Sequence, residues 1–145
     1  MKKLLLAALI VVAAGSSAFA LDVNTLNAKV KTNFEARFYG AQNVQWKLQE
    51  DFIKASFTYA DQPVEAFFTT DGELIGLSRK MDYQKLPLNA LQKIKTDYAR
   101  YQVVEAIEFE REGDKNYYVS LKEGTSVKIL EVSLYGSVSV FRGFK

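Results

Sequence analysis

Hydrophobic residues spaced three and four apart predict two helices, each followed by a run of strands. The first hydrophobic stripe spans residues 26–39 and consists of Leu26, Val30, Phe34 and Phe38. Asn24 or Thr25 could cap this helix, and Gly40 is a natural stop. The second stripe follows Pro87, a residue that suits the first turn of a helix. It consists of Leu91, Ile94, Tyr98 and Tyr101.

Alternating hydrophobic and polar residues predict four strands after each helix. The first set is expected at residues 44–48, 53–59, 64–70 and 73–81. The second set is expected at residues 103–111, 116–122, 126–134 and 137–144. Asp71-Gly72 is typical of a two-residue hairpin turn between antiparallel strands. Residues 81–85 form only a short connection between the two sets.

The order of one helix and four strands therefore occurs twice, and residues also align between the halves. Ala36-Arg37-Phe38 matches Ala99-Arg100-Tyr101 and Trp46 matches Phe109, both at a separation of 63, whereas Gly72 matches Gly136 at 64. Coincidence among ordinary helix and strand patterns is the alternative explanation.

One α-β4 unit alone cannot bury the apolar face of its sheet. We therefore predict an α+β fold, a tandem α-β4 repeat that forms one antiparallel sheet with two helices packed on one face. The subdomains are expected at about 24–81 and 86–145, within a single domain over residues 21–145.

The first 20 residues have the features of a secretory signal peptide. Lys2 and Lys3 precede an apolar run, and Ala18-Phe19-Ala20 fits the A-x-A cleavage site. The run is shorter than the roughly 20 residues of a membrane-spanning helix, and a chain without cysteine cannot be a lipoprotein. We predict cleavage after Ala20 and a periplasmic or secreted protein with no membrane span. An uncleaved anchor is the alternative.

Charge and composition exclude several classes of function. Without Lys2 and Lys3, the mature chain has 17 basic and 17 acidic residues, so it lacks the positive field that gathers nucleic acid. The absence of cysteine and histidine excludes Ser-His-Asp and Cys-His nucleophiles, thiolate redox chemistry, and the usual zinc and haem sites. Asp61 and Glu65, beside Pro63, are expected to be solvated loop charges. We therefore predict no cofactor and no enzymatic activity.

The sheet face away from the helices is the expected binding surface. Adjacent residues of a strand point to opposite faces, so Phe67 and Phe68, or Tyr117 and Tyr118, cannot both face a helix. The candidate surface consists of Lys54, Ser56, Phe67, Ile75, Tyr118, Ser120 and Lys122. Its aromatic residues would serve as anchors, unless a bulge or the N-terminal residues bury them. Trp46 and Phe109 are expected to be core residues.

Several of these motifs occur in a distinctive order. A helix rich in aromatic residues precedes the Trp46 strand, and Thr70-Asp71-Gly72-Glu73-Leu74, Leu86-Pro87 and Asn116-Tyr117-Tyr118-Val119 follow. Over residues 26–144 this order resembles the β-lactamase-inhibitor-like, PepSY-like periplasmic proteins common in Bacteroidetes. The resemblance implies a duplicated α-β4 fold and a periplasmic or secreted address, and it supplies no catalytic residues.

PepSY domains are associated with the restraint of secreted peptidases, so the resemblance implies a binding or inhibitory module with a protein partner in the envelope. An accessory protein that binds glycans or envelope polymers is the alternative. A carboxylate-based enzyme is the least favoured hypothesis.

Overall fold

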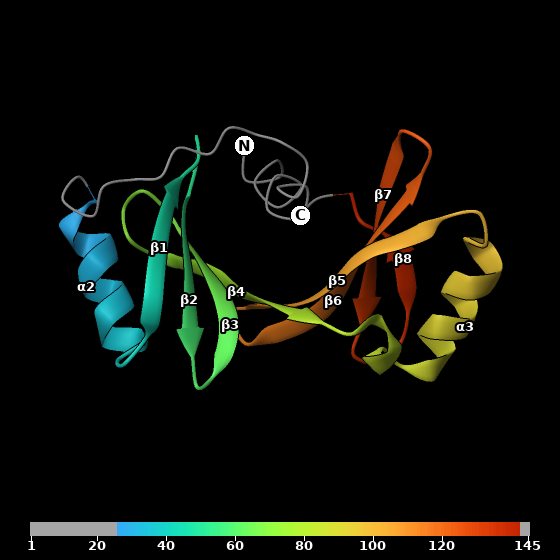
Figure 1. Cartoon of the computed structure of the whole chain (residues 1–145), viewed down its shortest axis with the longest axis horizontal. Helices are drawn as coiled ribbons and strands as arrows, with labels where there is room; N and C mark the ends of the chain where they lie inside the picture. The colour runs from blue at the N-terminus through green and yellow to red at the C-terminus, as the bar shows by residue number, and fades with distance from the viewer. Residues whose placement is uncertain (1–25, 143–145) are drawn as a thin grey trace. The chain divides into compact units, whose positions relative to one another are not determined.

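A computed structural model describes residues 26–142, so the predicted signal peptide lies outside the described residues. The fold is α+β, and its elements follow the predicted order (Figure 1). The first half contains α2 (Ala28–Arg37), β1 (Gln42–Leu48), β2 (Ile53–Tyr59), β3 (Gln62–Phe68) and β4 (Leu74–Met81). The second half contains a 3-10 helix (Tyr83–Lys85), α3 (Leu88–Asp97), β5 (Gln102–Arg111), β6 (Asp114–Glu123), β7 (Ser126–Ser133) and β8 (Val138–Val140).

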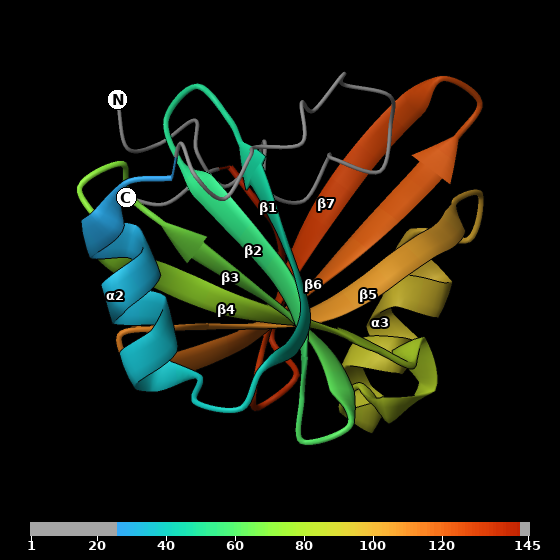
Figure 2. The ribbon, with the colours of Figure 1, turned by 60° about the vertical axis from the view of Figure 1, so that its left-hand side comes forward.

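The strands form an eight-stranded antiparallel sheet in chain order, β1 to β8. The chain divides into two compact units, whose described parts are residues 26–79, the first unit, and 80–142, the second unit. In each unit the helix covers one face of that unit's own strands (Figure 2). A single domain and a common face for both helices stay predictions. Within residues 26–142, no helix has the length and hydrophobicity needed to cross a membrane.

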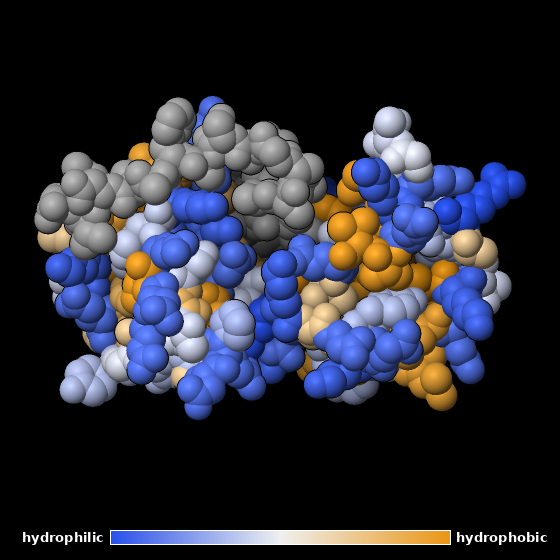
Figure 3. All heavy atoms as spheres, in the orientation of Figure 1, coloured by the Kyte–Doolittle hydropathy of each residue, from blue (hydrophilic) through white to orange (hydrophobic). Residues whose placement is uncertain are grey.

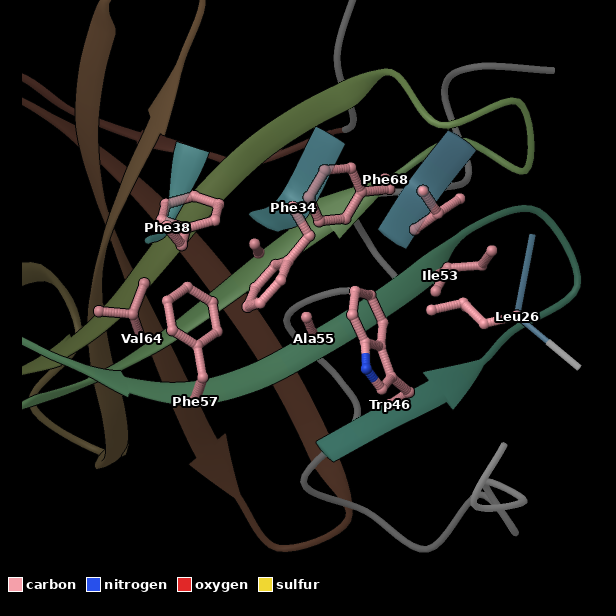
Figure 4. Close-up of a cluster of buried hydrophobic side chains, with 11 residues drawn as sticks. Leu26, Phe34, Phe38, Trp46, Ile53, Ala55, Phe57, Val64 and Phe68 are labelled. Carbon is pink, nitrogen blue, oxygen red and sulfur yellow. The ribbon is translucent and has the colours of Figure 1, made fainter. Parts of the chain in front are cut away.

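The first unit has an aromatic core between α2 and its strands. All four residues of the first predicted stripe are buried, as the periodicity indicates. Figure 4 shows Phe34, on α2, and Phe38, just after α2, among aromatic rings of the strands. The Phe34 ring meets Trp46 edge-on at 5.0 Å and Phe57 at 4.9 Å between ring centroids. Asn27 caps the start of the helix, because its side chain accepts a hydrogen bond from the Lys29 amide. The predicted caps, Asn24 and Thr25, lie outside the described residues.

The second unit has a smaller, mostly aliphatic core. Ala90 and Ile94 of α3 pack on strand residues that include Val119, Leu121 and Leu130. Only Ile94 of the second predicted stripe is buried, and its other members, Leu91, Tyr98 and Tyr101, are half-buried. The stripe therefore marks the correct face of the helix, but most of it borders the core without entering it. The sequence did not predict the 3-10 helix before α3.

The two units repeat each other, but in a different register from the one predicted. The helices begin 60 residues apart, and Trp46 corresponds to Ala106, since both face the helix of their unit. Matching Trp46 with Phe109 was therefore wrong. Phe109 is buried, as expected, but it lies on the strand face away from α3, beside Tyr118. The β5–β6 hairpin is longer than the β1–β2 hairpin, so equivalent residues after it are 64 residues apart, as Gly72 and Gly136 are.

Each helix is fastened to the turn between the last two strands of its unit. In the first unit, Asn27 and Asn33 donate side-chain hydrogen bonds to the carbonyls of Thr70 and Gly72, at 3.0 and 2.6 Å. In the second unit, Asn89 donates to the carbonyl of Tyr135 at 2.9 Å. The helix thereby lies directly against the turn glycine in both units.

Candidate binding site

The predicted binding surface is much less open than the sequence suggested. Of its seven residues, Lys122 is exposed, and Ser56 and Ile75 are half-buried. The four that are buried are Lys54, Phe67, Tyr118 and Ser120. The expectation of exposed aromatic anchors on this face is therefore wrong for Phe67 and Tyr118, although a binding role for the surface stays a prediction.

In the first unit, the side chains on this face contact one another. Phe67 and Phe68 point to opposite faces, as predicted, and Phe67 packs against Phe52 with 5.9 Å between ring centroids. The Lys54 ammonium lies 2.9 Å from the Glu65 carboxylate, to which the Ser56 hydroxyl also donates at 3.4 Å. Glu65 is therefore a paired strand residue and not the solvated loop charge expected from the sequence.

In the second unit, Tyr118 lies on the strand face away from α3. Its ring lies between Phe109 and Phe141, at centroid distances of 6.2 and 5.2 Å. Its hydroxyl donates to Glu131 Oε1 at 3.1 Å, which also accepts a hydrogen bond from Asn116. Burial, reinforced by the charge of Glu131, raises the pKa of Tyr118 well above its usual value. The polar tip is satisfied and the ring is covered, so Tyr118 acts as a structural residue.

A groove between the helix and the first strand occurs in both units. The first groove, of about 440 Å³, is lined by Lys31, Phe34, Glu35, Phe38, Tyr39, Gly40, Ala41, Val44 and Trp46. The second groove, of about 540 Å³, is lined by Tyr83, Gln84, Leu91, Ile94, Lys95, Tyr98, Ala99, Tyr101, Val103 and Leu121. Most of the helix residues correspond at a separation of 60, so the grooves belong to the repeat itself. The sequence pattern predicted the stripe residues of both grooves but not the grooves beside them.

The two grooves differ in charge. In the first, Lys31 and Glu35 lie one helical turn apart, with their charged groups separated by 3.9 Å. In the second, the corresponding positions are Leu91 and Lys95, so a hydrophobic residue and a cation replace the ion pair. No Asp or Glu is among the residues that line the second groove.

Tyrosine and lysine together define the chemistry of the second groove. The rings of Tyr98 and Tyr101 meet edge-on, with 6.0 Å between centroids. The ammonium of Lys128, on β7, lies 5.5 Å from the Tyr98 centroid and 5.2 Å from the Tyr101 centroid, which is within the range of cation–π attraction. Burial raises the pKa of Tyr83, which also lines this groove. The groove combines partly dehydrated aromatic side chains with positive charge.

Hydrophobic surface continues outward from this groove. Val103, at the start of β5, is 39% exposed, and its neighbour Val104 is 54% exposed. Figure 3 shows hydrophobic surface on this side of the second unit, bordered by hydrophilic side chains. Within the described part of the chain, no group of three or more carboxylates is placed to hold a metal ion. The arrangement is suited to binding an apolar group beside an anion.

Comparison with known proteins identifies the fold. No protein-family model matches the sequence, and no curated protein matches it. A solved structure of a DUF2874 family protein from Bacteroides uniformis is 12% identical, with a TM-score of 0.67 over 77% of this chain and 85% of that one.

Two further solved structures agree. A BLIP-like protein from Bacteroides fragilis is 13% identical, with a TM-score of 0.64 over 82% of this chain and 89% of that one. A protein described as a candidate periplasmic protein, from Bacteroides eggerthii, is 10% identical, with a TM-score of 0.65 over 80% of this chain and 89% of that one. At such low identity the likeness concerns the fold alone. The chain therefore has the α+β fold shared by DUF2874 and BLIP-like proteins of Bacteroides, as the sequence motifs indicated.

Proposed function

We propose that this protein is a non-enzymatic binding module of the periplasm that holds a segment of a protein partner in the groove between α3 and β5. The observation that carries the proposal is the set of large side chains left half-buried there. Leu91 of α3, and Tyr98 and Tyr101 just after that helix, belong to the predicted stripe but border open space. A partner that covers them would bury apolar surface that folding alone leaves partly in water.

The type of side chain also favours a protein partner. Tyrosine presents a rigid apolar ring with a polar tip, and it is enriched in protein interfaces for that reason. Three tyrosines line this groove, together with Leu91 and Val103. Tyr83 belongs to the 3-10 helix, and Tyr98 and Tyr101 lie between α3 and β5. The buried contacts of Ile94 and Ala90 hold α3 in place beside them. A preformed groove of this kind lowers the entropic cost of binding.

The proposed periplasmic location is inferred from the predicted signal peptide. It is supported by a structural neighbour that is described as periplasmic. The BLIP-like name of another neighbour supports inhibition or regulation of an envelope or secreted protein as the specific role. Binding of a glycan or envelope polymer is less well supported, because the Lys128 ammonium occupies a position over the two tyrosine rings, where a sugar ring would stack.

The test is a quantitative pull-down from periplasmic extract of the native host. Tagged residues 21–145 are compared with the double variant Tyr98→Ala/Tyr101→Ala. A matched control is Tyr135→Ala, because Tyr135 is 91% exposed and lies in a turn outside the groove. Circular dichroism and the melting temperature check that each variant is folded.

We expect one defined protein to be recovered by the wild type and the control, with recovery at least about tenfold lower for the double variant, a change that corresponds to roughly 1.4 kcal/mol in binding. Equal recovery by all three proteins, or no protein enriched by the wild type, would contradict the proposal.

A further inference from the structure

We propose that the segment held in the second groove is acidic, with a carboxylate placed at Lys95 and Lys128 and an adjacent apolar side chain against Leu91 and Val103. This inference rests on the proposed function and specifies the chemistry of the partner at that same site. It is carried by the charge of the groove and by the position of Lys128.

The charge of the second groove is one-sided. Lys95 is exposed at the border, and no Asp or Glu lines the groove. The nearby Lys93 and Asp97 of α3 form an ion pair with each other at 2.7 Å, so their charges neutralise one another. In the first unit, the residue that corresponds to Lys95 is Glu35, which faces Lys31. A shared scaffold therefore has a neutralised groove in one unit and a cationic groove in the other.

Lys128 strengthens this preference for an anion. Its side chain is half-buried, and its ammonium lies over Tyr98 and Tyr101 at 5.5 and 5.2 Å from the ring centroids. An ammonium in this position keeps N–H donors for a further partner, and partial removal from water strengthens its attraction to a carboxylate. The rings hold the cation in place, so less side-chain entropy is lost when an anion binds.

A peptide fits these features better than an acidic glycan. Sugar recognition needs several polar side chains for hydroxyl groups and an open aromatic face for stacking. Here the lining is mainly aliphatic and aromatic, and Gln84 is the amide among its residues. A carboxylate next to a leucine-like or phenylalanine-like side chain matches both the lysines and the apolar lining.

The experiment is a selection from a random dodecapeptide display library on the folded protein, residues 21–145. We expect the selected sequences to carry more Asp and Glu than the starting library and to contain a large apolar residue beside them. The same selection is run on Lys95→Gln/Lys128→Gln and on the control Lys122→Gln. Lys122 is exposed, does not line the groove, and follows Leu121, which faces α3, so its side chain points to the other face of β6.

The best acidic peptide is then synthesised together with a version in which Gln replaces each acidic residue. We expect binding of the acidic peptide to shift the ring signals of Tyr98 and Tyr101 in NMR spectra, and its affinity to fall about tenfold in Lys95→Gln/Lys128→Gln, with no change in Lys122→Gln. Selection of neutral or basic peptides, selection of none, or equal binding of the Gln version would overturn the inference. Tighter binding of a tetrauronate at the same tyrosines would assign the groove to a glycan and would also overturn it.

The two proposals fail in different ways. If the Lys95→Gln/Lys128→Gln variant recovers the host protein as well as the wild type does, the acidic specificity is refuted while the groove keeps its role. If Tyr98→Ala/Tyr101→Ala has no effect on recovery, the groove itself is refuted.

Discussion

Replacement of Gly72 by alanine tests how closely α2 lies against the β3–β4 turn. Gly72 has φ +95°, and a Cβ built on it would lie 3.0 Å from both the Lys29 carbonyl carbon and the Val30 nitrogen. These are helix backbone atoms, and the hydrogen bond from Asn33 to the Gly72 carbonyl holds the helix in place. An alanine at positive φ costs about 1–2 kcal/mol, and overpacking adds about 1–3 kcal/mol. We therefore expect Gly72→Ala to lower the free energy of unfolding by about 2–5 kcal/mol.

Gly40→Ala is the matched control in the same unit. Gly40 has φ +83° but no atom within 4 Å of a built Cβ, so only the backbone cost of about 1–2 kcal/mol applies. Urea unfolding followed by Trp46 fluorescence measures both variants, because Trp46 is buried beside α2. A Gly72→Ala variant that loses no more stability than Gly40→Ala would refute the close approach of helix and turn.

Two further predictions concern buried aromatic residues. Phe34→Ala removes the ring that contacts Trp46 and Phe57, and it should cost about 3–5 kcal/mol in urea unfolding; a loss below about 1 kcal/mol would contradict the described core. Tyr118→Phe should cost about 1.5–3 kcal/mol at pH 7, because the hydrogen bond to the Glu131 carboxylate is lost. The pKa of Tyr118 in the folded protein is raised above 10.0, so the Tyr118 hydroxyl contributes fully to the free energy of unfolding below pH 10 and contributes less as the pH rises further. The difference in unfolding free energy between wild type and variant should therefore narrow above pH 10. A difference that widens there would contradict this reasoning.

The order of elements was predictable because short-range patterns determine it. Residues 26–39 have a helical period and also the aromatic rings that form the core, so periodicity and burial agree there. Asp71-Gly72 correctly marked a hairpin, but not the two-residue turn predicted: the loop spans residues 70–72, the Thr69 amide donates to the Glu73 carbonyl, and Gly72 has a positive φ whereas Asp71 does not. Gly136, which the sequence matched to Gly72, has a positive φ as well.

The repeat register was harder to predict because similar residue types do not establish structural equivalence. Trp46 and Phe109 are both aromatic residues in first strands, yet Phe109 lies three residues beyond Ala106, the counterpart of Trp46, and this odd offset puts the two side chains on opposite faces relative to their helices. A difference in hairpin length leaves the alternation of each strand intact. The pattern alone therefore cannot reveal which residues correspond.

The candidate site was missed for a related reason. The spacing of Leu91, Tyr98 and Tyr101 shows which face of the predicted helix they share but not how deeply each is buried. The opposite error occurred for Phe67 and Tyr118, which pack against Phe52 and Phe141. Those two residues lie outside the strands, so alternation within a strand gave no sign that they cover the surface.

The most direct test of the binding groove is site-specific photocrosslinking in the envelope of the native host. A benzophenone amino acid replaces Val103, which lines the second groove, or Val127, which is 54% exposed and does not line it. We predict that one protein crosslinks from position 103, that its yield falls at least about tenfold when Tyr98 and Tyr101 are alanine, and that position 127 gives little product. Equal products from both positions, or no product from position 103, would contradict a partner segment in this groove.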